Sequence, residues 1–68
     1  MTIDNAKLSI AMANEGLLYK DLCQKAGIHE VTLRQIRKGS RNPKPSTVGK
    51  IAKALNVDVR DIIQEEGE

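Results

Sequence analysis

Seven basic side chains lie in the middle of the chain with no acidic residue among them. They fall within residues 34–53 and are Arg34, Arg37, Lys38, Arg41, Lys44, Lys50 and Lys53. Residues 54–68 reverse this balance, because they hold five acidic residues against Arg60. Ordinary solvated helix faces can also carry such charges, but an unbroken basic stretch is suited to neutralising several phosphates. The charge pattern therefore indicates a nucleic-acid partner for the middle of the chain.

Residues suited to catalysis or metal binding are scarce. Cys23 is the only cysteine and His29 the only histidine, which excludes an internal disulfide and a self-contained zinc site of the usual kind. These two residues fall on different expected helices, and no third group is evident that would orient a base. A glycine-rich phosphate loop is also lacking. The sequence thus predicts a binding module and not an enzyme, with no metal and no cofactor, and with Cys23 as a small buried hydrophobic residue.

Length and composition favour one small all-α domain spanning residues 1–68. The apolar residues make up 40% of the chain and are nearly all aliphatic, which suits packed helices better than a β-sandwich or barrel. No apolar run approaches the roughly 18 residues of a membrane-spanning helix. The first residues also lack the basic start and apolar run of a secretory signal. We expect a reduced, cytoplasmic protein.

Apolar periodicity and helix-ending residues predict five helices. Asp4 is expected to cap the first, Pro45 to begin the fourth, and Asp58 to cap the fifth. Gly49 lies inside the fourth helix, where it should cost about 1 kcal/mol relative to alanine. The helices are expected near residues 4–14, 19–26, 30–38, 45–55 and 59–64, with a frayed tail at residues 65–68.

The second and third of these helices have the spacing of a helix-turn-helix unit. A small residue at Cys23 allows the two helices to cross closely, and Gly27 takes the bend between them. Ile28, Leu33 and Ile36 then hold the third helix across the second. In this geometry the second helix of the unit lies in the DNA major groove. A plain helical hairpin in a small bundle is the alternative.

Further motifs join this unit and extend from Gly16 to Ile63, about 48 of the 68 residues. They are Lys38-Gly39-Ser40-Arg41-Asn42-Pro43, then Lys50-Ile51-Ala52-Lys53-Ala54-Leu55-Asn56-Val57, then Asp61-Ile62-Ile63. With these motifs the chain resembles the phage-repressor and Cro-type helix-turn-helix family, the XRE-like or lambda-repressor-like DNA-binding domains. The resemblance implies a compact five-helix fold and a DNA-binding regulator in a bacterial or phage-host cytosol.

Several positions depart from the family pattern. Tyr19 replaces the usual Gln at the start of the second helix, and Leu18 before it is a weak cap. His29 stands where Ser or Thr usually caps the third helix, so we expect a poor cap or a phosphate contact. The family often buries an Arg on the first helix against a Glu on the third. Here those positions hold Met12 and Arg37, so the internal ion pair is replaced on both sides.

The resemblance assigns base reading to the exposed N-terminal half of the third helix. Gln35 can bond to adenine, Arg34 to guanine and Glu30 to cytosine, while Val31 can pack on a thymine methyl. Glu30 is alternatively a favourable charge at the helix N-terminus. Lys50 and Lys53 are interpreted as solvated. The residues expected to hold backbone phosphates are Tyr19, Thr32, Lys38, Ser40, Arg41 and Lys44.

One such domain holds little DNA, and the family commonly dimerises so that two recognition helices reach grooves about 34 Å apart. The predicted homodimer surface is formed by Val59, Ile62 and Ile63, with Val57 beside them; these aliphatics could instead close the core of a monomer. The sequence therefore predicts a sequence-specific transcriptional regulator of double-stranded DNA, most simply a small repressor on an inverted-repeat operator. No membrane partner or small-molecule effector is expected. An antitoxin or a control protein of a mobile element is a related alternative, and an RNA-binding or protein-interaction module is an unrelated one.

Overall fold

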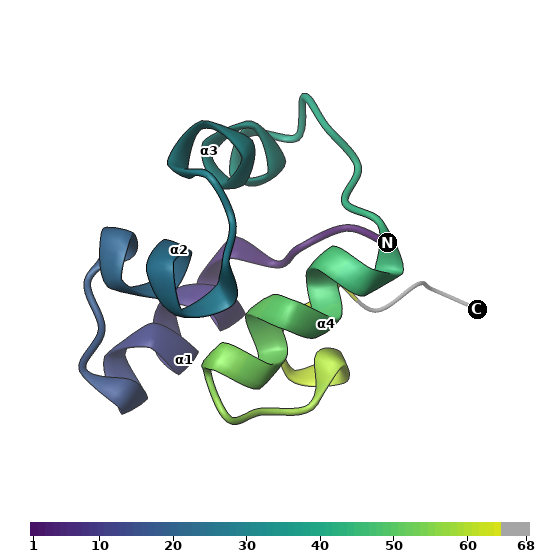
Figure 1. The fold of residues 1–68 in the computed structure, drawn as a ribbon. Helices are drawn as coiled ribbons and strands as arrows, with labels where there is room; N and C mark the ends of the chain where they lie inside the picture. Colours follow the sequence, from purple (N-terminus) through teal and green to yellow (C-terminus); the bar gives the residue numbers. More distant parts are fainter. Residues whose placement is uncertain (65–68) are drawn as a thin grey trace.

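Four α-helices and one 3₁₀ turn form the part of the chain described by the structure, residues 1–64 of a computed structural model (Figure 1). The expected frayed tail at residues 65–68 lies outside this range. The four α-helices begin and end within one residue of the predicted positions. The elements are α1 (Asn5–Glu15), α2 (Tyr19–Ala26), α3 (Glu30–Lys38), α4 (Pro45–Ala54) and the 3₁₀ turn η1 (Val59–Asp61).

The prediction of a fifth α-helix over residues 59–64 is wrong, because the chain forms only the single turn η1 there. Ile62 leaves helical geometry, and Ile63 pairs with Ile3 in an isolated antiparallel bridge. The Asp4 N–H donates to the Ile62 carbonyl at 2.9 Å, and the Gln64 N–H donates to the Thr2 carbonyl at 2.9 Å. Backbone groups that a longer helix would use are therefore bonded to the N-terminal segment.

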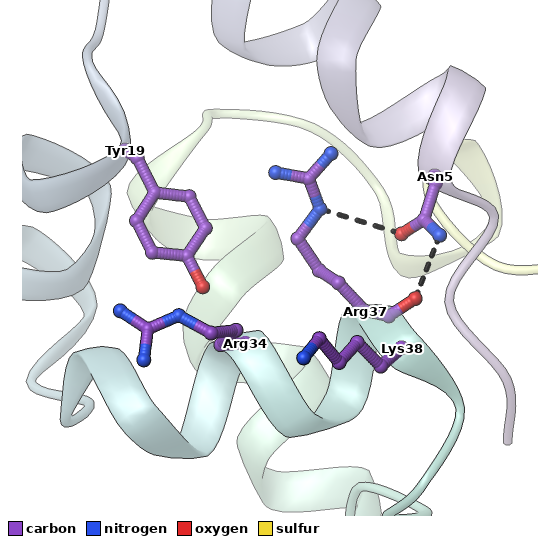
Figure 2. A pocket seen from close by; sticks show the side chains of 5 residues that line it. All are labelled: Asn5, Tyr19, Arg34, Arg37 and Lys38. Atoms are coloured by element: carbon purple, nitrogen blue, oxygen red, sulfur yellow. Dashed lines mark hydrogen bonds between the residues drawn. The ribbon is translucent and has the colours of Figure 1, made fainter.

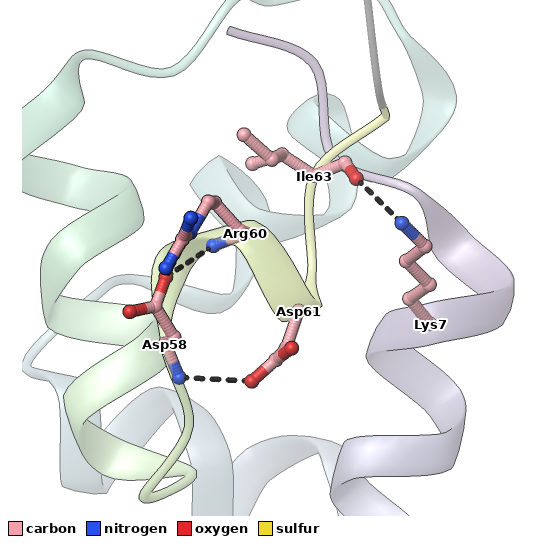
Figure 3. A network of polar contacts seen from close by, with 5 residues as sticks. All are labelled: Lys7, Asp58, Arg60, Asp61 and Ile63. Atoms are coloured by element: carbon pink, nitrogen blue, oxygen red, sulfur yellow. Dashed lines mark hydrogen bonds and ion pairs between the residues drawn. The ribbon is translucent and has the colours of Figure 1, made fainter.

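Side-chain caps determine where α1 and η1 begin. The Asp4 carboxylate accepts from the Lys7 N–H at 3.0 Å, as predicted for the start of α1. Asp58 accepts from the Arg60 N–H at 2.9 Å, and Asp61 accepts from the Asp58 N–H at 3.1 Å (Figure 3). The Arg60 N–H holds the pKa of Asp58 below its ordinary value, so the carboxylate remains a charged acceptor.

All four α-helices contribute buried side chains to one hydrophobic core. Val59 of η1 packs against this core, and Ile62, directly after η1, is buried in it. Cys23 is buried, and burial raises the pKa of its thiol, which confirms its role as a small hydrophobic residue. No helix within residues 1–64 is long and apolar enough to cross a membrane. The fully buried side chains are Leu8, Leu22, Leu33, Val48, Ile51, Leu55 and Ile62.

Gly49 has no packing role that requires the absence of a side chain. A Cβ added there would meet nothing within 4 Å, and its backbone is that of α4. Gly49→Ala is therefore expected to stabilise the protein by about 1 kcal/mol, which raises Tm by about 4–8 °C for a domain of this size.

Gly27→Ala is the matched control, because a Cβ there also meets open space but the backbone has φ +71°. This left-handed conformation disfavours alanine, so the same chemical change should lower Tm. Thermal melting of both variants checks the pair. A lower Tm for Gly49→Ala would contradict the expectation.

Candidate nucleic-acid interface

α3 presents one continuous exposed face. Its inward residues, Leu33 and Ile36, are buried in the core and fix the rotation of the helix. All four residues predicted to read bases are exposed, and even the apolar Val31 is 45% exposed. Thr32 is half-buried, so it lies at the margin of this face. The exposed face consists of Glu30, Val31, Arg34, Gln35 and Lys38.

The start of α3 is capped by His29, so the prediction of a poor cap is wrong. Its Nδ1 atom accepts from the Val31 N–H at 3.2 Å, the bond that a Ser or Thr hydroxyl would otherwise provide. An accepting Nδ1 requires the proton of a neutral ring to lie on Nε2. The exposed imidazole thus caps the helix and keeps one N–H donor for an external acceptor.

Tyr19 links the start of α2 to both ends of α3. Its hydroxyl donates to the Glu30 carbonyl at 3.4 Å, and the Arg37 guanidinium carbon lies 5.6 Å from its ring centroid. Burial raises the pKa of Tyr19, so the hydroxyl stays protonated and able to donate. A phosphate that took this donor would compete with the bond to Glu30.

The C-terminal end of α3 joins a predicted base-reading residue to two predicted phosphate contacts. Gly39 ends the helix with φ +81°, and the N–H and hydroxyl of Ser40 both donate to the Gln35 carbonyl, at 3.1 and 3.2 Å. Arg41 Nη1 donates to Gln35 Oε1 at 3.5 Å. Lys44 is exposed at the start of α4. The amide of Gln35 therefore lies beside the guanidinium of Arg41.

Arg37 and Asn5 form a contact that the sequence analysis did not assign. Asn5 Nδ2 donates to the Arg37 carbonyl at 2.8 Å, and Arg37 Nε donates to Asn5 Oδ1 at 3.5 Å (Figure 2). Arg37, which stands where the family often has a Glu, is thus bonded by the amide of Asn5 on the first turn of α1. Met12 packs against the core. The repeat of Arg34, Arg37 and Lys38 along one side of α3 was the available sequence signal for this region.

An open pocket of about 390 Å³ lies beside this contact, between α3 and the first turns of α1 and α2 (Figure 2). Among the described residues that line it, three side chains are cationic and none is acidic. The lining residues are Asn5, Tyr19, Arg34, Arg37 and Lys38. No group of three or more metal-ligating side chains occurs within residues 1–64.

The aliphatic residues predicted to form a dimer surface differ in exposure. Ile62 is 0% exposed and belongs to the core, so the prediction that it contacts a second copy is corrected. Val57, Val59 and Ile63 are partly buried and pack on the outside of this core. Lys7 Nζ donates to the Ile63 carbonyl at 3.3 Å, which ties this segment to α1 (Figure 3).

Comparisons with known proteins agree with this geometry. A family model described as helix-turn-helix matches residues 8–62, most of the chain. The fold is similar to that of the restriction-modification controller protein C.AhdI from Aeromonas hydrophila, with a TM-score of 0.71. The two sequences are 24% identical, and the match covers 81% of this chain and 83% of the controller protein. No curated protein matches in sequence. The chain therefore belongs to the helix-turn-helix family of DNA-binding transcriptional regulators of the phage-repressor and Cro type.

Proposed function

We propose that this protein is a small cytoplasmic repressor that binds an inverted-repeat operator as a homodimer and reads bases through α3. The observation that carries the proposal is the exposed face of α3. Glu30, Val31, Arg34 and Gln35 lie there together, and the basic stretch of residues 34–53 begins on the same helix. Side chains that can bond base edges and side chains that can bond phosphates are thus adjacent, as sequence-specific recognition requires.

In the proposed complex α3 lies in the major groove. Gln35 offers a donor and an acceptor to adenine, Arg34 offers two donors to guanine, and Val31 packs on a thymine methyl. Glu30 accepts from cytosine and disfavours bases that present only acceptors. Lys38, Ser40, Arg41 and Lys44 hold the backbone on the C-terminal side of the helix, and Thr32 and Tyr19 contribute from its margin. These phosphate contacts set the register in which the base contacts form.

Because Ile62 is buried in the core, our proposal for the homodimer surface uses Val57, Val59, Ile63 and the outer side of α1. Ile10 on α1 is 63% exposed, and it lines a shallow hollow of about 220 Å³ together with Val57. Lys7 and Asp61 line the same hollow. In a two-fold dimer the same patch meets itself, so a cation of one copy can pair with the carboxylate of the other beside the exposed aliphatic side chains. A second copy of this chain is therefore the proposed occupant.

Ile10→Ser is expected to weaken dimerisation about tenfold, because it removes an exposed apolar contact without opening the core. Leu18→Ser is the matched control, since Leu18 is an equally accessible aliphatic residue, 68% exposed, outside the hollow. Sedimentation of the free proteins over a range of concentrations measures the effect. Equal dimer dissociation constants for the two variants would refute this surface, and a wild-type protein that remains monomeric on its operator would refute the dimer.

Selection of bound sequences from a pool of random duplexes tests the function itself. The expected result is enrichment of an inverted repeat whose half-sites lie about 34 Å apart, one turn of the double helix. Enrichment of a single half-site would contradict symmetric binding. Absence of any enrichment, with equal affinity for duplex RNA, would favour the RNA-binding alternative.

A further inference from the structure

Arg37 is positioned by neutral groups and has no carboxylate partner among residues 1–64. Within residues 1–64 the only ion pair joins Arg60 and Asp58, whereas Arg37 is positioned by neutral groups. Its Nε atom donates to Asn5 Oδ1, and its guanidinium lies over the Tyr19 ring. These contacts use the face and one N–H of a group that has five N–H donors. Donors at the Nη end remain for an acceptor outside the protein.

The pocket beside Arg37 concentrates positive charge. Arg34 and Lys38, three residues before it and one after it on α3, line the same depression of about 390 Å³. Figure 2 shows all three cationic side chains around the space bounded by Tyr19 and Asn5. No acid is among the lining residues, and Glu30 lines a different hollow on the other side of Arg34. Mutual repulsion of the three cations is relieved when an anion enters.

We propose that this pocket seats one phosphodiester of the operator backbone, with Arg37 as its fixed ligand and Lys38 as its second cation. The inference rests on the proposed function and deepens it, because it assigns a phosphate contact to a residue outside the predicted set. A phosphodiester oxygen accepts paired N–H groups of a guanidinium, which an ammonium cannot offer in that geometry. Arg34, at the border between the pocket and the base-reading face, stays free to turn toward the groove.

Asn5 and Tyr19 act as positioning residues in this arrangement. Asn5 fixes the Nε side of the guanidinium and bonds the Arg37 carbonyl, so α1 and α3 are joined at the pocket. Tyr19 supplies the surface on which the guanidinium rests. Arg37 thus loses little side-chain freedom on binding, and its phosphate contact places the end of α3 relative to the backbone.

A double-mutant cycle between protein and DNA tests the contact. Operator duplexes carry one uncharged methylphosphonate in place of one phosphate, position by position, and bind wild-type protein or Arg37→Gln. We expect one position in each half-site where the modification costs the wild type about tenfold in affinity and costs Arg37→Gln less than twofold. Lys53→Gln is the matched control, because it removes one charge from the basic stretch but lines a separate hollow with Lys25 and Lys50.

The outcomes separate this inference from the proposed function. If the affinity losses from each methylphosphonate and from Arg37→Gln simply added at every position, with Tm unchanged, the phosphate contact of Arg37 would be refuted. The preference for the operator over scrambled DNA would still support the proposed function. Equal wild-type affinity for selected and scrambled duplexes would overturn sequence-specific function. In that case the salt dependence of binding to scrambled DNA still tests the phosphate contact. A plot of log affinity against log salt concentration that is flatter by about one ion for Arg37→Gln than for Lys53→Gln supports the contact, and equal slopes contradict it.

Discussion

Ile62→Ala is expected to destabilise the protein by about 2–5 kcal/mol, because it removes a large part of a fully buried side chain and leaves a cavity. A domain of this length has a total stability of about 3–10 kcal/mol, so the substitution removes a large share of it. Ile62 also accepts the Asp4 N–H through its carbonyl, so loss of its packing loosens the start of α1. Urea unfolding followed by circular dichroism measures the effect.

Ile63→Ala provides the comparison, since Ile63 is its neighbour and is only partly buried. Its cost to the folded protomer should be clearly smaller. If Ile62→Ala left the unfolding curve unchanged and instead abolished dimerisation, the original placement of Ile62 in a dimer surface would be restored. A similar loss for both variants would show that the whole segment packs as one unit.

Gln35→Ala is expected to cost about 1–3 kcal/mol on the operator and very little on scrambled DNA, because the lost group reads a base. Its salt dependence should hardly change. Lys38→Ala, one helical turn further along α3, should weaken binding to both duplexes similarly and flatten the salt slope by about one ion. Salt titrations of affinity for both duplexes with each variant provide the measurement.

Two contacts sharpen the interpretation of this comparison. Arg41 donates to Gln35 Oε1, so Gln35→Ala also releases a neighbouring cation, and Gln35→Glu would hold it more firmly. Glu30→Gln is a useful control, because it removes a carboxylate near phosphates and should tighten non-specific binding. Equal losses on operator and scrambled duplexes for Gln35→Ala would show that α3 does not read bases through this residue.

The sequence predicts those parts of the fold that depend on nearby residues. Asp4 marks the start of α1, Pro45 marks the start of α4, and glycines mark the ends of the first three helices. Each of these residues acts within one turn of its own position. The exposed face of α3 was likewise predictable, because the spacing of Leu33 and Ile36 determines which side of the helix turns inward.

Contacts between distant residues were not predictable in the same way. The fifth helix was expected because Val59, Ile62 and Ile63 have helical spacing. Instead, hydrogen bonds with the N-terminal segment end the helical turn at Ile62 and pair Ile63 with Ile3. The bonds between Asn5 and Arg37 span 32 residues, and nothing in either local sequence indicates them. The cap by His29 depends on the orientation of its ring, which residue type alone does not give.

The antiparallel pairing of Ile3 with Ile63 joins two segments whose synthesis is separated by about 60 residues. The Asp4 N–H and the Thr2 carbonyl have their backbone partners in Ile62 and Gln64, so these two hydrogen bonds form only after both segments have been synthesised. A nascent chain can build α2 and α3 beforehand, but the core lacks Ile62 until that residue has emerged. Forming this bridge restricts a loop of about 60 residues, whose closure entropy favours its formation late in folding.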